Sequence, residues 1–310
     1  MNEFELINRL TNSLPTNKSL VTGAGDDCAV LDLGIPDRLL LFKTDAVVEG
    51  MHFTADTPPE QIGYKALARC LSDIAAMGGT PNSAVITLAL PRDFDVGRVE
   101  KIYEGMNALA AKHDVAIVGG ETTTNPERML ISVALLGTVP RGKCVLRSGA
   151  LAGDAIFVTG ELGGSLKGKH LDFEPRLAEA QWLVEHFPIH AMIDLSDGLA
   201  GDLRHILKAS HVGAELFSSA IPVSRAAKLA SKAESSGKPP LLAALTDGED
   251  FELLFTVASR DAVPLLDAWK KRFPHLKLSC IGKIVAGGKL TLRDKTGTRS
   301  LSAHGYVHFT

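Results

Sequence analysis

Residues 192–199 read Met-Ile-Asp-Leu-Ser-Asp-Gly-Leu and place two carboxylates, Asp194 and Asp197, three positions apart. The residues before Asp194 are apolar, whereas Leu199 and the leucines and isoleucines after it recur at helical spacing. The stretch therefore predicts the end of a buried strand, a tight turn at Gly198 and the start of a helix.

A helix start of this kind offers chemistry as well as structure. It presents free backbone N–H groups and the positive end of the helix dipole, to which phosphate oxygens bind. Two carboxylates beside it suit Mg²⁺. The alternative is helix capping, for which Ser and Asp are also preferred. The second acid, and similar clusters elsewhere in the chain, favour a metal and phosphate site.

The composition argues against several classes of protein. The 310 residues are 45% hydrophobic, which is enough for two domains with sizeable cores. A net charge of −3 argues against nucleic-acid binding and against a basic membrane anchor. The four cysteines are far apart, so we expect neither a zinc site nor a disulfide framework. No apolar run reaches the length of a membrane span and no signal peptide is recognisable, so we expect a cytoplasmic protein.

Three further segments combine acids with small or hydroxyl residues beside an apolar run. Residues 23–31 place two adjacent acids before a short strand, with a solvated turn as the alternative. Strands are expected over residues 39–42 and 115–118, and they run directly into Lys-Thr-Asp and into Gly-Gly-Glu-Thr-Thr-Thr. Ligands gather at strand ends in open α/β sheets, and the glycine pair would let a phosphate approach the backbone.

Asp73 lies on a helix instead of a strand. The helix is predicted over residues 62–77, because apolar residues recur there on one face, and Asp73 lies beside that face. A carboxylate so placed needs a partner, so Asp73 is either a metal ligand or a surface residue. Arg147 is either a phosphate clamp or a surface residue. The spacing of His52 carries no functional signal by itself.

The remaining elements follow from the same periodicity rules. Helices are expected over 4–14, 96–113, 176–186, 223–231, 240–245 and 262–272, and strands over 83–90, 129–139, 155–158, 212–216, 278–285 and 289–292. Residues 149–153 are expected to link two domains.

Residues 163–170, Gly-Gly-Ser-Leu-Lys-Gly-Lys-His, nearly match the P-loop pattern. His170 stands where a Mg²⁺-binding Ser or Thr is required, and Pro175 interrupts the helix that should follow. We therefore expect a flexible glycine and lysine loop there, and no nucleotide site.

The acids point to metal-assisted chemistry if they cluster. Clustered carboxylates repel one another unless cations neutralise them, and Mg²⁺ binds through carboxylates together with substrate phosphates. We expect acids from both halves of the chain to share Mg²⁺ ions that hold a polyphosphate, so that positioning and charge neutralisation carry phosphoryl transfer. The acids concerned are Asp27, Asp45, Asp73, Glu121, Asp194 and Asp197.

Several motifs in a fixed order resemble those of the thiamine-monophosphate kinase family. They are GxGDDCAVL from Gly23, TDxxxEGxHF from Thr44, YKALA from Tyr64, LSDIAAMG from Leu71, GGETT from Gly119, LRSGA from Leu146, IDLSDGL from Ile193 and GEDFELLF from Gly248. The resemblance runs from residue 23 to the final Gly-Tyr-x-His-Phe. The family shares a superfamily with aminoimidazole ribonucleotide synthetase, selenophosphate synthetase and a hydrogenase maturation protein.

The resemblance implies a two-domain fold of the aminoimidazole ribonucleotide synthetase type, in the α/β (α+β) class. Residues 1–148 would form an N-terminal ATP-binding, metal-binding and dimerisation domain, with a mixed sheet whose strands build the homodimer. Residues 149–310 would form a C-terminal α/β domain that completes the active-site cleft.

The implied reaction is the ATP-dependent phosphorylation of thiamine monophosphate to thiamine diphosphate, with several Mg²⁺ ions. No general base is assigned, because the acceptor phosphate is already anionic at neutral pH. Carried over by motif, the metal ligands are Asp27, Thr44, Asp45, Asp73, Glu121, Asp194 and Asp197. The ATP contacts are Tyr103, Gly120, Glu121, Arg147 and Ser196, and the substrate contacts are His52, Glu249 and Tyr306.

Four residues depart from the pattern of the family. Lys43 stands where Ser is usual, and Glu121 replaces an Asp. Thr124 stands where Arg is common, and Asp247 replaces a Gly. A cation at Lys43 could replace one Mg²⁺ or repel it. These departures bear on the number of metal ions and on affinity more than on the class of reaction.

Three alternatives remain open from the sequence. A selenophosphate synthetase would need a reactive Cys in an N-terminal glycine-rich loop, and Cys28 lies just after Asp27. A hydrogenase maturation protein would need a C-terminal Cys, whereas this chain ends in Phe309-Thr310. A non-catalytic nucleotide-binding relative stays open because of Lys43 and Thr124.

Overall fold

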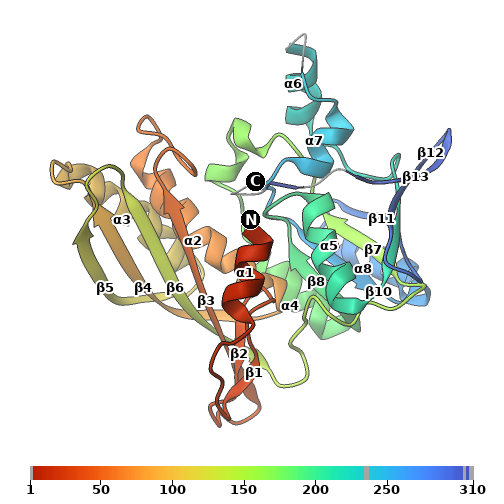
Figure 1. The fold of residues 1–310 in the computed structure, drawn as a ribbon, viewed down its shortest axis with the longest axis horizontal. Coiled ribbons are helices and arrows are strands. Elements are labelled where there is room, and N and C mark those ends of the chain that lie inside the picture. Colours follow the sequence, from red (N-terminus) through yellow and green to blue (C-terminus); the bar gives the residue numbers. More distant parts are fainter. Residues whose placement is uncertain (1–2, 234–236, 303–304, 307–310) are drawn as a thin grey trace. The chain divides into compact units, whose positions relative to one another are not determined.

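The computed structural model describes residues 3–233, 237–302 and 305–306, and the chain divides into two compact units. Residues 19–144 and 168–181 form what we call the N-terminal unit, and the other described residues form the C-terminal unit. Figure 1 shows a sheet with packed helices in each of them.

The N-terminal unit is built on a six-stranded mixed sheet with the order β1-β2-β3-β6-β4-β5. Neighbouring strands are antiparallel except for β4 and β5, which are parallel and joined through α3. The strands are β1 (Leu20–Thr22), β2 (Ala29–Leu31), β3 (Arg38–Val48), β4 (Thr80–Leu90), β5 (Ala116–Thr124) and β6 (Leu130–Pro140).

Helices α2 (Pro59–Ala76) and α3 (Val96–Lys112) cover one face of this sheet (Figure 1). Helix α2 carries the predicted apolar face, which is buried, and the chain turns away at Gly78, whose φ is 71°. The two helices touch at two glycines: a Cβ on Gly63 would overlap the carbonyl oxygen of Ile102, and one on Gly105 would overlap that of Glu60. The close approach of α2 and α3 therefore requires glycine at both positions.

Two strands extend further than the sequence predicts. Strand β3 continues through Lys43-Thr44-Asp45 as far as Val48, and β5 includes the whole Gly-Gly-Glu-Thr-Thr-Thr segment. Both stay extended because they keep a pairing partner: Asp45 lies opposite Val133 of β6, and Glu121 lies beside Thr87 of β4. The expectation that these acids close their strands is therefore wrong.

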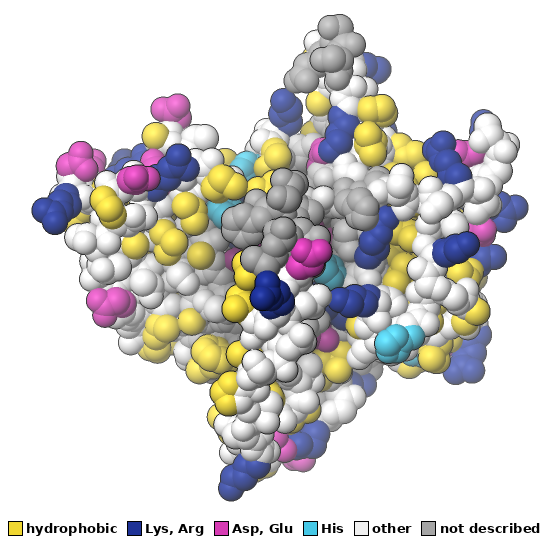
Figure 2. All heavy atoms as spheres, in the orientation of Figure 1, with side chains coloured by type: hydrophobic (Ala, Val, Ile, Leu, Met, Phe, Trp, Pro, Cys, Tyr) yellow, Lys and Arg dark blue, Asp and Glu magenta, His cyan; other side chains and the backbone are white. Residues whose placement is uncertain are grey.

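The other face of the N-terminal sheet is not covered by the helices of its own unit. Phe42 lies opposite Leu136, and Val85 lies opposite Ala134, so these residues share that face. Phe42 is 45% exposed and Val85 is 42% exposed. In Figure 2 the surface over β3 to β6 is mainly hydrophobic or uncharged, and the charged side chains gather toward its rim.

The C-terminal unit has a seven-stranded sheet with the order β13-β12-β9-β11-β7-β10-β8, in which only β12 and β9 are parallel. Strand β13 was not predicted from the sequence. The strands are β7 (Ala155–Thr159), β8 (Ile189–Asp194), β9 (Gly213–Phe217), β10 (Leu253–Val257), β11 (Leu278–Val285), β12 (Leu290–Asp294) and β13 (Gly297–Ser300).

Alternate residues of these strands face two different sides of the sheet. Ile156, Val158 and Leu254 join a buried cluster with the apolar residues of α5, whereas Phe157 and Phe255 stack on each other with ring centroids 5.6 Å apart. The unit's helices are α1 (Glu3–Thr11), α5 (Leu199–Ser210), α6 (Arg225–Ala233), α7 (Pro240–Thr246) and α8 (Ala262–Arg272). Helix α4 (Leu177–His186) has residues in both units, and short 3₁₀ turns are η1 (Ser165–Lys167), η2 (Lys169–Leu171) and η3 (Ser259–Asp261).

The prediction for residues 192–199 is confirmed. Strand β8 ends at Asp194, the chain turns at Gly198 with a φ of 103°, and α5 begins at Leu199. Among the described residues, the helices are too short or too polar to cross a lipid bilayer.

Candidate active site

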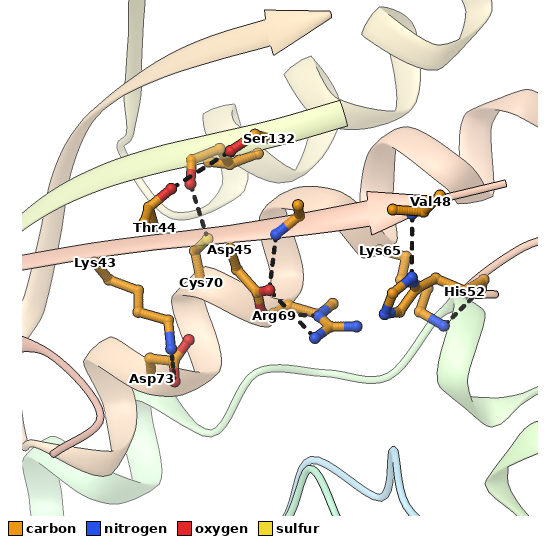
Figure 3. Close-up of polar contacts among 12 residues, drawn as sticks. Lys43, Thr44, Asp45, Val48, His52, Lys65, Arg69, Cys70, Asp73 and Ser132 are labelled. Carbon is orange, nitrogen blue, oxygen red and sulfur yellow. Dashed lines mark hydrogen bonds and ion pairs between the residues drawn. The ribbon is translucent and has the colours of Figure 1, made fainter. Parts of the chain in front are cut away.

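Helix α2 presents three charged side chains toward one region of the N-terminal unit. Lys65, Arg69 and Asp73 are four residues apart, so they share one face of the helix. Lys65 is 1% exposed and Asp73 is 6% exposed. Buried charges need partners, and β3 supplies two of them, as Figure 3 shows.

Both partners from β3 form close ion pairs. Lys43 Nζ lies 2.8 Å from Asp73 Oδ1. Arg69 Nε donates to Asp45 Oδ2 at 2.9 Å, and an Arg69 terminal nitrogen donates to Asp45 Oδ1 at 3.3 Å. The backbone N–H of Ala46 also donates to Asp45 Oδ1, at 2.7 Å. Both carboxylate oxygens of Asp45 are therefore engaged.

The environment keeps these groups charged. Burial alone would lower the pKa of the Lys43 ammonium, but the carboxylates of Asp73 and Asp45 outweigh burial and raise that pKa. Burial alone would raise the pKa of Asp45, but the positive charges of Arg69 and Lys43 and two kinds of hydrogen bond lower it. Lys43 and Arg69 therefore stay positively charged, and each lies against a carboxylate of the group.

Asp27 adds a third carboxylate to this group. It is 2% exposed, and one of its carboxylate oxygens lies within 4.8 Å of one from Asp73. Two oxygens bound to opposite sides of one Mg²⁺ would lie roughly 4 Å apart, at about 2 Å from the ion each. Asp27 and Asp73 therefore fit a divalent ion in donor type and spacing, whereas Asp45 would first have to release Arg69.

Two predicted metal ligands lie away from this group. The Thr44 side chain is exposed on the opposite face of β3, where its hydroxyl lies 3.4 Å from Ser132 Oγ (Figure 3). Glu121 is exposed on β5, and two strands, β6 and β4, separate β5 from β3. Neighbouring strands are roughly 4.8 Å apart, so Glu121 is about 14 Å from the line of β3. The N-terminal unit by itself does not bring these side chains to Asp45 and Asp73.

The other predicted residues of the N-terminal unit occupy different elements. Tyr103 is half-buried on α3, where burial raises its pKa. Gly120 lies on β5 so close to Ile86 that a Cβ would overlap the Ile86 carbonyl oxygen. Tyr103 and Gly120 therefore lie on other elements than Asp27 and Asp73.

His52 is held in place by a residue that the sequence analysis missed. The buried Lys65 Nζ donates to the His52 carbonyl at 2.7 Å and lies 2.8 Å from His170 Nδ1. The backbone N–H of Val48 donates to His52 Nδ1 at 3.1 Å, which leaves Nε2 to carry the proton of a neutral ring. The sequence indicated this only indirectly, because Lys65 interrupts an otherwise apolar face of the predicted helix.

In the C-terminal unit, three segments far apart in sequence meet at the loop after β8. The backbone N–H of Glu249 donates to the Ser196 carbonyl at 2.7 Å, and that of Tyr306 donates to the Asp197 carbonyl at 2.8 Å. Residues 195 and 251–252 exchange two further backbone hydrogen bonds. The structure thus brings together Ser196, Asp197, Glu249 and Tyr306, which were assigned to ATP, metal and substrate.

The Glu249 segment has an unusual backbone. Glu249 has a φ of 63° and Phe251 a φ of 49°, both in the left-handed region that non-glycine residues rarely adopt. Such conformations persist where the surrounding structure enforces them and are frequent at ligand sites. The hydrogen bonds to residues 195 and 196 supply that enforcement.

Asp202 is a second residue that the sequence analysis missed. Its carboxylate accepts the backbone N–H groups of Asp197 at 3.1 Å and of Gly198 at 3.0 Å. Burial raises the pKa of Asp202, as do the charges of Asp197 and Asp194, while the charge of Arg147 lowers it. Asp197, Asp202 and His205 have ligand atoms within 4.8 Å of one another. An acid in the first turn of a helix was the signal, but it also suits the helix dipole.

Asp194 and Arg147 belong to the same electrostatic environment. Asp194 is 4% exposed at the end of β8, and its charge acts on Asp202, as does that of the half-buried Arg147. Arg147 therefore lies near acids, where a phosphate with its metal ions could be held between opposite charges. This environment suits the predicted phosphate clamp.

The first two glycines of the P-loop-like segment donate to carboxylates of the protein. The Gly163 N–H donates to both carboxylate oxygens of Asp250, at 3.0 and 2.9 Å, and the Gly164 N–H donates to Asp247 at 3.0 Å. The Ser165 hydroxyl also donates to Asp250. Protein carboxylates thus occupy the donors that a phosphate would need. Gly163 packs against α7 and Gly164 against α6.

Comparison with known proteins identifies the class. The family described as AIR synthase related protein matches with its N-terminal domain over residues 25–139 and with its C-terminal domain over residues 151–295. Two mixed sheets with packed helices agree with this match, so the fold predicted from the motifs is confirmed. The protein is an AIR synthase related protein of two domains.

Relatives that match nearly the whole chain show which family within this class the protein belongs to. The chain is 40% identical over 306 residues to a thiamine-monophosphate kinase of Rhodopirellula baltica, covering 96% of this chain and 93% of the relative. The solved structure of AaThiL complexed with AMPPCP and TMP matches with a TM-score of 0.82 at 31% identity, covering 99% and 97% of the two chains. The chain belongs to the thiamine-monophosphate kinase family, as its motifs predict.

A more distant structure shares the fold. HypE of Escherichia coli, a hydrogenase maturation protein, matches with a TM-score of 0.71 at 22% identity and covers 97% of each chain. At this identity the likeness concerns architecture alone.

Proposed function

We propose that the protein transfers the γ-phosphoryl group of ATP to thiamine monophosphate, which yields thiamine diphosphate and ADP. The full-length similarity to a thiamine-monophosphate kinase and the likeness to AaThiL with AMPPCP and TMP support this reaction. At the site, the observation that carries it is the junction of Ser196 and Asp197 with Glu249 and Tyr306 in one hydrogen-bonded loop system. Backbone hydrogen bonds thereby link Ser196 and Asp197, assigned to ATP and metal, to Glu249 and Tyr306, assigned to thiamine monophosphate.

The acids of both units are the proposed magnesium ligands. Asp27 and Asp73 in the N-terminal unit and Asp194 and Asp197 in the C-terminal unit would hold Mg²⁺, which supplies charge neutralisation for the transferring phosphoryl group. Asp45 would join this set only after Arg69 releases its carboxylate. Thr44 and Glu121 belong to the set through their motifs alone, because both lie away from the Asp27 and Asp73 carboxylates in the N-terminal unit.

The remaining residues position the two substrates. Arg147 binds the ATP phosphates with its guanidinium, and Ser196, Tyr103, Gly120 and Glu121 complete the nucleotide contacts. His52, Glu249 and Tyr306 contact the acceptor, whose thiazolium cation suits an acid and an aromatic ring. The acceptor phosphate is already anionic, so the site needs no strong general base.

We further propose a cytoplasmic homodimer, with domains at residues 1–148 and 149–310. The four cysteines are free thiols, as is usual in a reducing compartment. The uncovered face of the N-terminal sheet, with Phe42 and Val85 exposed, is the proposed contact between two copies.

The test is a direct assay. Purified protein is incubated with Mg-ATP and either thiamine monophosphate or free thiamine, and thiamine diphosphate is measured by fluorescence after oxidation. Product is expected from the monophosphate and not from thiamine. An absence of product above the blank from the monophosphate would refute the proposed reaction.

A non-catalytic nucleotide-binding protein is the second candidate. The engagement of Asp45 and Asp73 by Arg69 and Lys43 favours it, because both acids were assigned to metal. Such a protein would bind AMPPCP with Mg²⁺ and yield no product in the same assay. The selenophosphate synthetase alternative has less support, because Cys28 is 2% exposed and burial raises its thiol pKa.

A further inference from the structure

Two positively charged side chains, Lys43 and Arg69, lie among the acids of the N-terminal unit. Lys43 forms an ion pair with Asp73, and Arg69 forms one with Asp45. A carboxylate oxygen of Asp27 lies within 4.8 Å of one from Asp73. If the acids stood alone, their three negative charges would call for more than one divalent ion. With the two cations present, a single negative charge remains among these five residues.

Each cation is bound where a metal ion would have to bind. Lys43 Nζ lies 2.8 Å from Asp73 Oδ1, and the Arg69 guanidinium donates to both oxygens of Asp45. Metal ions use these same carboxylate oxygens as ligands. A divalent ion on Asp45, or on Oδ1 of Asp73, would therefore compete with a positive charge that the chain already holds there.

The two cations lie on regular elements, β3 and α2, that also carry the acids they pair with. Arg69 lies one helical turn before Asp73 on α2, and Lys43 and Asp45 lie on one face of β3. The side chains of all four are at most 23% exposed, so water screens their attraction only in part. The cations therefore act as preformed charges that need no binding from solution.

We propose that Lys43 and Arg69 are built-in cations that take the place of further divalent ions on Asp73 Oδ1 and on Asp45, beside the one ion proposed for Asp27 and Asp73. The N-terminal unit then binds fewer metal ions than it would with uncharged residues at these positions, and the chain's own cations provide part of the charge that faces ATP. This inference rests on the proposed function for its role in catalysis, but the metal count can be measured without turnover.

The test counts bound Mn²⁺ by electron paramagnetic resonance of the free ion, with saturating AMPPCP. Lys43→Met removes the charge and adds no oxygen ligand, whereas Lys43→Arg keeps the charge. We expect about one more Mn²⁺ per chain in Lys43→Met than in the unmodified protein, and no change in Lys43→Arg. Lys283→Met is the matched control. It also removes a lysine from an ion pair, but this lysine is half exposed and pairs with Glu215 in the C-terminal unit.

Arg69→Met gives an independent measurement that does not depend on the folding of the Lys43 variants. It removes the guanidinium from both oxygens of Asp45, so it too should bind about one more Mn²⁺. Thermal unfolding with and without Mn²⁺ should show a larger rise in Tm on adding the metal to Lys43→Met or Arg69→Met than to the unmodified protein. Equal Mn²⁺ counts in the folded variants and the unmodified protein would overturn the inference.

The two proposals fail in different ways. A lack of thiamine diphosphate in the assay would refute the proposed function and leave the Mn²⁺ counts unaffected. Full activity with unchanged Mn²⁺ counts in both variants would refute the built-in cations and leave the reaction standing.

Discussion

Asp194 is the single residue whose charge we expect to matter most for activity. It is 4% exposed, and its charge disfavours ionisation of the neighbouring Asp202. Asp194→Asn keeps the shape and removes the charge, so we expect turnover to fall by about 100-fold or more, because a metal ligand is lost. The fold should be as stable as before or more stable, since one repulsion disappears.

Turnover in this variant is measured with the fluorescence assay, and Tm by circular dichroism. Asp267→Asn, at an exposed position on α8, is the control and should leave both unchanged. Full activity in Asp194→Asn would remove this residue from the metal site.

The cysteines give a prediction for pH. Burial raises the pKa of Cys144 to about 12, with a contribution from Asp26, and burial also raises the pKa of Cys28, Cys70 and Cys280. The thiolate is the reactive form, so at pH 8 the native protein should react slowly with a disulfide reagent. In denaturant the thiols regain their ordinary pKa, and all four should react quickly. Fast labelling of native Cys28 would contradict this and revive the selenophosphate synthetase alternative.

At the scale of elements, the contact between α2 and α3 supports the site, because α2 carries Lys65, Arg69 and Asp73. Gly63→Ala would place a methyl group on the Ile102 carbonyl oxygen, which the backbone of α3 cannot easily avoid. We expect a loss of about 3 kcal/mol in the free energy of unfolding, and weaker metal binding.

Urea unfolding followed by far-UV circular dichroism measures the loss. Tryptophan fluorescence serves as a local comparison, because Trp182 and Trp269 both lie in the C-terminal unit, with ring centroids 5.9 Å apart. Gly97→Ala in the first turn of α3 is the control: its Cβ would meet only Asp95 at 3.5 Å, so stability should be kept or slightly increased. Equal stability of both variants would show that α2 and α3 can separate at no cost.

At the scale of the whole molecule, the uncovered sheet face predicts the state of association. Phe42 and Val85 share this face and are both more than 40% exposed. The double variant Phe42→Glu and Val85→Glu puts charges there, so we expect a dimer to dissociate into monomers. Light scattering coupled to size exclusion gives the mass. Val263→Glu, at a 66% exposed position on α8, should keep the mass of the unmodified protein.

Local patterns predicted the parts of the fold whose signals lie within a few residues. The strand, turn and helix around Asp194 were recognisable because apolar residues, Gly198 and the helical repeat follow one another directly. The full length of β3 and β5 could not be predicted from local patterns, because their polar residues stay extended only through pairing with β6 and β4. An extended β3 alone would have predicted the place of Thr44, since side chains alternate along a strand and Thr44 lies between Lys43 and Asp45.

The order of residues in this chain was enough to assign an α/β fold, a family and a set of acids suited to magnesium, because motif spacing and side-chain chemistry are properties of short segments. The partners of those acids depend on contacts between segments far apart in the chain. The ion pairs of Arg69 with Asp45 and of Lys43 with Asp73 form because helix α2 packs on strand β3 and brings opposite charges within 3 Å of each other. The hydrogen bond from the Asp197 backbone N–H to Asp202 likewise depends on the fold of the loop, and no local pattern records these contacts.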